Sequence, residues 1–119
     1  MRDIRDVVMP VGDWLLVDGT VDNSVAIAAV DGDEGCVLTG TRVRRAGWAA
    51  SAAHPSAGGG PVGWPPVDAE ITISLTAEDW SYVVAELARW AAVGDGAGMD
   101  EERDSARVER FLRARLSDL

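Results

Sequence analysis

Few side chains in this sequence could do covalent chemistry, and they are scattered along the chain. His54 is the single histidine, between Ser51 and Ser56, and Cys36 is the single cysteine. A histidine metal site needs further ligands at short spacing, and a Ser-His-Asp triad needs a rigidly held nucleophile. Neither accompanies His54, so we expect no catalytic role for it. Cys36 has no adjacent arginine to activate its thiol and is typical of a small buried apolar residue.

Acidic residues gather in turns but match no metal-binding motif. Asp31, Asp33 and Glu34 form one such turn. A calcium-binding EF-hand loop needs oxygen ligands at alternate positions, then a glycine and a distal glutamate, and this pattern is absent from the sequence. The glycines 58–60 lack the Lys-Ser/Thr pair that completes a phosphate-binding P-loop. We therefore predict no cofactor, no metal and no enzymatic activity. A small carboxylate-based or metal-assisted enzyme is the alternative, if acids from distant turns converge.

Arginines and aromatic residues are the better candidates for contacts with a partner. Arg42 and Arg44 would share one face of a strand, and Arg103, Arg107 and Arg110 would share one side of a helix. Five tryptophans are many for so short a chain, and tryptophan is enriched where partners bind. The predicted interaction surface comprises Trp14, Trp48, Trp64, Tyr82, Arg42, Arg44, Arg103, Arg107 and Arg110.

The charge balance narrows the class of partner. The chain carries 20 acids against 11 bases, a net charge of −9, and every base is an arginine. Without lysine there is no Schiff base and no P-loop lysine. Such a field repels polyanions, which disfavours nucleic acid, and attracts basic proteins. An RNA- or DNA-binding module would need both arginine groups on one face.

Length and hydropathy predict one globular domain spanning residues 1–119. The 119 residues are 47% hydrophobic and 26% charged, which is ordinary for such a domain. No apolar run reaches the ~18 residues of a membrane span. The mixed charges of residues 1–6 do not resemble a secretory signal, and a single cysteine excludes an internal disulfide. We therefore expect a cytoplasmic protein with no membrane contact.

The first third of the chain predicts β structure. Three short apolar runs, at residues 14–17, 25–30 and 36–43, are separated by Asp-Gly pairs. Asp-Gly between apolar runs is a hairpin signal, so the second and third runs are expected to pair antiparallel. A short helix capped by Ser24 is the alternative for the second run. Residues 46–67 are rich in glycine, proline and alanine and predict a loop, from which at least one of Trp48 and Trp64 docks on the body of the domain.

The last part of the chain has the clearest periodicity. Residues 69–75 alternate apolar and polar side chains, which predicts a strand with one wet face. Thr76 then caps a helix, whose apolar stripe includes Trp80, Val83, Val84 and Leu87. A second helix begins near Asp100, and the short connection predicts that the two helices pack as an antiparallel hairpin.

These elements predict an α+β fold, in which a mostly antiparallel sheet is covered by a C-terminal helical hairpin. For function, the acidic charge and spare tryptophans favour a small non-enzymatic protein, an inhibitor, immunity or accessory protein, that docks on a larger basic partner. A self-assembling structural subunit, forming a homo-oligomer, is the main alternative.

Overall fold

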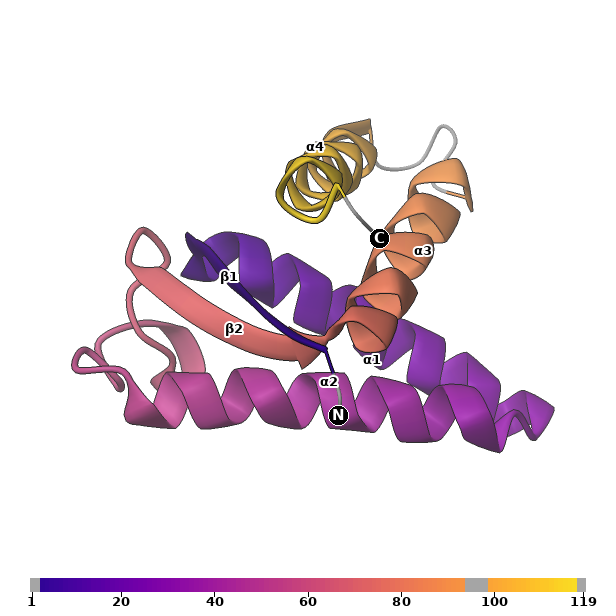
Figure 1. The fold of residues 1–119 in the computed structure, drawn as a ribbon, viewed down its shortest axis with the longest axis horizontal. Coiled ribbons are helices and arrows are strands. Elements are labelled where there is room, and N and C mark those ends of the chain that lie inside the picture. Colours follow the sequence, from indigo (N-terminus) through magenta and orange to yellow (C-terminus); the bar gives the residue numbers. More distant parts are fainter. Residues whose placement is uncertain (1–2, 94–98, 118–119) are drawn as a thin grey trace.

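The computed structural model describes the backbone of residues 3–93 and 99–117, and the side chains of residues 3–92 and 104–117. In chain order the elements are β1 (Ile4–Pro10), α1 (Val11–Asp31), α2 (Glu34–Ala53), the short 3-10 helix η1 (Pro61–Gly63), β2 (Glu70–Thr76), α3 (Ala77–Val93) and α4 (Met99–Arg115). The α1–α2 hairpin is thus inserted between the two strands (Figure 1). The predicted α+β class is confirmed.

The sheet of the described residues consists of β1 and β2 alone, paired antiparallel from Ile4 opposite Thr76 to Pro10 opposite Glu70. One face carries Val7 and Met9 of β1 with Ile71, Ile73 and Leu75 of β2, all buried. The other face is exposed. The predicted strand 69–75 is confirmed within one residue, whereas β1 was not predicted.

The predicted β-meander in the first third of the chain is wrong. Residues 14–17 and 25–30 both belong to the single helix α1, and residues 36–43 belong to α2. α1 buries Val11, Trp14, Val17 and Val21 on one face, but its other faces are also rich in apolar residues. The helical period is therefore hidden, and Asp18-Gly19, which resembles a turn, lies inside the helix.

The Asp-Gly signal at residues 31–35 marks a turn between helices instead of between strands. Gly32 ends α1 in the left-handed conformation, with φ of 78°, where glycine has no steric cost. The side chain of Asp33 then accepts a hydrogen bond from the Cys36 N–H at 3.1 Å and caps the start of α2. The same residue types serve both kinds of turn, which explains the wrong assignment.

α2 replaces the first part of the predicted 46–67 loop, because the helix continues to Ala53. Its buried residues are small: Gly40, Val43, Gly47 and Ser51. The remaining connection, residues 54–69, is irregular apart from η1. Trp64 packs against the core from this segment, as predicted for at least one loop tryptophan.

The C-terminal helices form as predicted. Thr76 caps α3 by accepting a hydrogen bond from the Asp79 N–H at 3.1 Å. α3 buries Trp80, Val83, Val84 and Leu87, and α4 buries Val108 and Leu112, followed by the buried Leu116 just after its end. The two helices pack on each other. At the centre of the core Trp14 and Trp80 meet edge to face, with ring centroids 6.4 Å apart.

Candidate interaction surface

The two chemically reactive side chains of the sequence have structural partners. His54 Nδ1 accepts a hydrogen bond from the Ser56 N–H at 3.0 Å, so the ring proton lies on Nε2, which donates to the Glu70 carbonyl at 2.8 Å. Cys36 Sγ lies 3.4 Å from the Tyr82 hydroxyl oxygen, where α2 meets α3. Burial and this contact raise the pKa of Tyr82 above its ordinary value. His54 fastens the loop to β2, and Cys36 with Tyr82 joins two helices.

Arg42 and Arg44 do not share a face. Residues two positions apart lie on the same face of a strand, but they point in nearly opposite directions from a helix such as α2. Arg42 reaches α3 and forms two hydrogen bonds to the Asp79 carboxylate, at 2.6 and 2.8 Å. Asp79 is buried, so this pairing supplies the counter-charge that its carboxylate needs. The hydrogen bond to Asp79 also raises the pKa of Arg42.

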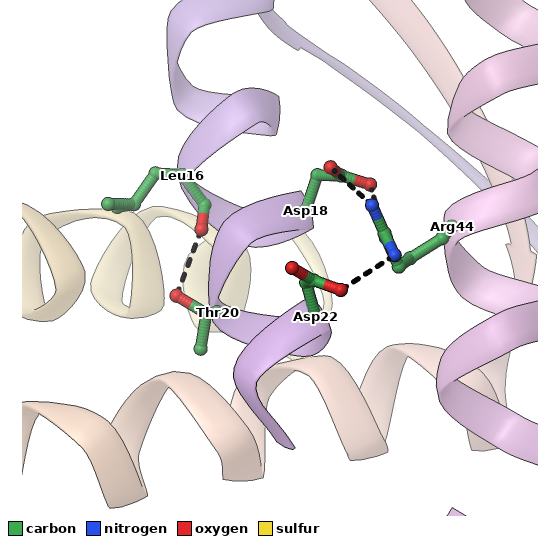
Figure 2. Close-up of polar contacts among 5 residues, drawn as sticks. All are labelled: Leu16, Asp18, Thr20, Asp22 and Arg44. Carbon is green, nitrogen blue, oxygen red and sulfur yellow. Dashed lines mark hydrogen bonds and ion pairs between the residues drawn. The ribbon is translucent and has the colours of Figure 1, made fainter. Parts of the chain in front are cut away.

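Arg44 lies on the other side of α2 and binds two acids of α1, as Figure 2 shows. Its guanidinium donates to Asp18 at 3.0 Å and to Asp22 at 2.9 Å. The guanidinium also lies 5.0 Å from the ring centroid of Trp48, within the range of a cation–π contact. The pKa of Arg44 is raised, chiefly by the hydrogen bond to Asp18. Arg44 therefore joins α1 to α2.

Of the three arginines predicted to share one side of α4, the structure describes the side chains of two. Arg107 binds Asp13 at the start of α1, with bonds of 2.9 and 3.1 Å, and the Asp13 bond raises its pKa. Arg110 is exposed. The side chain of Arg103 lies outside the described residues. Three of the five candidate arginines thus hold helices of this chain together.

The candidate aromatic residues differ in their exposure. Trp14 is 0% exposed, so its assignment to an interaction surface is wrong: it fills the core between α1, α2 and α3. Trp64 and Tyr82 are partly buried against the core. Trp48 is 46% exposed on the outer side of α2 and remains available to a partner.

The structure exposes an apolar surface that the sequence did not single out. Val30 is 87% exposed, Leu38 66% and Ile27 38%, all near the turn that joins α1 to α2. In Figure 1 this turn extends past the other elements of the molecule. Beside it lies a shallow hollow of about 370 Å³, whose lining includes Val37, Leu38, Asp33 and Glu34.

We call this surface the hairpin end, and define it by the apolar residues Ile27, Val30, Val37 and Leu38 with the acids Asp31, Asp33 and Glu34. Isolated exposed apolar side chains are ordinary, but several of them near one turn, with exposed acids beside them, are typical of a contact surface. A sequence signal existed: a helix that is apolar on all sides is expected to be covered on all sides. This signal indicates an exposed apolar surface only once residues 11–31 are known to form one helix.

Comparisons with protein-family models, curated proteins and solved structures found no match to this chain. Among the described residues no helix is long and apolar enough to cross a membrane. Nor does any group of three histidine, cysteine or acidic residues in the described ranges have the arrangement of a metal site.

Proposed function

We propose that this protein is a small acidic binding protein that docks on a basic protein partner through the hairpin end. The observations that carry this proposal are the exposure of Ile27, Val30 and Leu38 near the α1–α2 turn and the exposure of the three acids of that turn. An apolar centre with a charged rim is the usual anatomy of a protein interface. A matching partner presents an apolar spot surrounded by arginine or lysine.

The internal ion pairs support the choice of a basic partner. Arg42, Arg44 and Arg107 each bind an acid of this chain, so their charges are largely compensated within the fold. The acids at the hairpin end lie on an exposed turn instead. With a net charge of −9, the molecule attracts a basic protein at long range and speeds its encounter.

The same charges oppose self-association at this surface. Two copies meeting through their hairpin ends would place Asp31, Asp33 and Glu34 near the same acids of the partner copy. Like charges brought together in an interface are unfavourable. A homo-oligomer built on this surface is the competing possibility, and the experiment must distinguish it from binding to a basic protein.

The test is capture of a partner from lysate of the native host with three immobilised proteins: wild type, Leu38→Asp and Val62→Asp. Leu38→Asp places a charge at an exposed apolar position of the hairpin end, in the lining of its hollow. Val62 is 98% exposed and lies in η1, at the opposite end of the molecule from the α1–α2 turn (Figure 1), so Val62→Asp is a matched control. Circular dichroism verifies that all three proteins are folded.

The proposal predicts a protein of net positive charge that wild type and Val62→Asp retain and that Leu38→Asp loses. Capture of the same proteins by all three baits would refute the role of the hairpin end. Recovery of the chain itself, lost with Leu38→Asp, would show a homo-oligomer instead.

A further inference from the structure

The outer edge of β1 carries peptide groups that are free to pair. In an antiparallel pair, the peptide groups of alternate residues point toward the partner strand, and those of the residues between point away. The Ala77 N–H donates to the Asp3 carbonyl and the Val11 N–H donates to the Ala69 carbonyl, one bond at each end of the ladder. Odd-numbered residues of β1 therefore face β2. The peptide groups of Ile4, Asp6 and Val8 point away from it.

The two edges of the sheet differ. On β2 the outward carbonyl of Glu70 is bound by His54, and α2 packs alongside the strand (Figure 1). On β1, no residue in the described ranges forms a hydrogen bond with the outward peptide groups of Ile4, Asp6 or Val8. An unpaired edge is a template for another strand, and a sheet of two strands gains most from such an addition.

The side chains along this edge define what would fit there. Ile4 is 55% exposed and Val8 is 48% exposed, and the exposed Asp6 lies between them on the same outer face. Asp6 accepts a hydrogen bond from the Ser74 hydroxyl at 2.6 Å, which holds the carboxylate over the sheet. An added strand would place three of its side chains opposite these three residues.

We propose that β1 binds an extended segment of a partner protein as a third strand, with an apolar, a basic and an apolar residue at alternate positions. Backbone hydrogen bonds at Ile4, Asp6 and Val8 would supply affinity, and the basic residue opposite Asp6 would supply selectivity. This site is distinct from the hairpin end, so the inference goes beyond the function proposed above.

A second copy of the chain fits this edge poorly. The two-fold antiparallel register that sets Ile4 opposite Val8 of the other copy also sets Asp6 directly opposite Asp6. Like charges directly opposite each other destabilise a sheet. A basic residue at the same position is attracted instead, and this charge complementarity selects a basic segment over a second copy.

The experiment uses three short synthetic peptides and isotope-labelled full-length protein. The first peptide has valine, arginine and valine at alternate positions with threonine between them. The second has glutamate in place of arginine, and the third is the first with its strand-pairing amides methylated. Nuclear magnetic resonance follows the amides of Ile4, Asp6 and Val8 during titration with each peptide.

The proposal predicts that the arginine peptide shifts these three amides and slows their hydrogen exchange. It should bind about two- to five-fold more tightly than the glutamate peptide, the range of one cross-strand ion pair. The methylated peptide should not bind. In Asp6→Arg the preference between the first two peptides should reverse, and in Asp6→Asn, which keeps the side-chain size, it should disappear.

Any of three results would overturn the proposal. One is that the arginine peptide leaves the β1 amides unchanged, and another is that the methylated peptide binds equally well. The third is dimerisation of the protein alone, detected by light scattering, with protection of the same amides, which would identify a second copy as the occupant. Retained far-ultraviolet circular dichroism of both Asp6 variants shows that the sheet itself is intact.

Discussion

At the scale of single residues, the contact of Gly47 with Trp14 decides how closely α1 and α2 pack. A Cβ atom added at Gly47 would clash with the indole nitrogen of Trp14, far inside van der Waals contact. Trp14 is fully buried and packs against Trp80, so its ring has nowhere to move. Glycine here is required by space, although it is a poor helix former.

We therefore expect Gly47→Ala and Gly19→Ala to have opposite effects on stability. At Gly19, an exposed position inside α1, an added Cβ meets nothing within 4 Å. Gly19→Ala should stabilise the fold by about 0.5–1 kcal/mol through helix propensity alone. Gly47→Ala should destabilise it by about 1–3 kcal/mol through overpacking. Urea denaturation measures both, and equal stabilisation by the two substitutions would contradict the packing described for Trp14.

The titration of Tyr82 gives a second test at this scale, because Tyr82 is the only tyrosine of the chain. Its pKa is raised above the ordinary value of 10.0, first by burial and then by the contact with Cys36. The free energy of unfolding should be unaffected by Tyr82 below pH 10.0. It should fall above that pH, because the phenol ionises in the unfolded chain before it ionises in the folded one.

Near-ultraviolet absorbance of the phenolate follows this titration, with and without urea. The unfolded chain should show phenolate near pH 10.0, and the folded chain should show it only at higher pH. If phenolate appears at the same pH in both while circular dichroism remains native, Tyr82 is not shielded as described.

At the scale of elements, arginines join helices that are distant in sequence. Arg44 joins α2 to α1, Arg42 joins α2 to α3, and Arg107 joins α4 to α1. Guanidinium groups suit this role because they bind a carboxylate with two parallel hydrogen bonds. From the sequence alone these arginines are expected on an outward surface, because a sequence does not show which acids lie opposite them.

We expect a measurable coupling energy between Arg44 and Asp18. A double-mutant cycle with Arg44→Gln and Asp18→Asn, measured by urea denaturation, should give about 1 kcal/mol, since both side chains are mostly covered and Asp22 shares the arginine. The control cycle is Arg113→Gln with Glu109→Gln, an ion pair within α4. It should give only about 0.3–0.5 kcal/mol. Equal couplings would mean that Arg44 does not hold α1 to α2.

The elements also show what the sequence could and could not predict. β2, α3 and α4 each have one buried and one exposed face, so the periodicity of their sequences predicts where these elements lie in the chain. α1 and α2 do not follow that rule. α1 is apolar on several faces, which hides its helical period. α2 buries glycine and serine, whereas an amphipathic helix is recognised by a stripe of large apolar residues. β1 was missed because Ile4 and Val8 on its wet face blur the alternation.

At the scale of the whole molecule, the fold pairs Arg42, Arg44 and Arg107 with acids of the chain and leaves exposed acids at the end of the α1–α2 hairpin. Of the candidate site, only the sign of its charge could be predicted, because the net charge of −9 favours a basic partner. Its location could not, because Val30 and Leu38 resemble core residues until the length of the helical hairpin is known.

The most direct measurement of this claim is the salt dependence of the dissociation constant of the captured complex. Wild type is compared with a variant carrying Asp31→Asn, Asp33→Asn and Glu34→Gln, in which the asparagine that replaces Asp33 can still cap α2. We predict that salt weakens wild-type binding, whereas the variant binds more weakly at low salt and responds little to added salt. Identical dissociation constants and identical salt dependence for the two proteins would contradict recognition of a basic partner at the hairpin end.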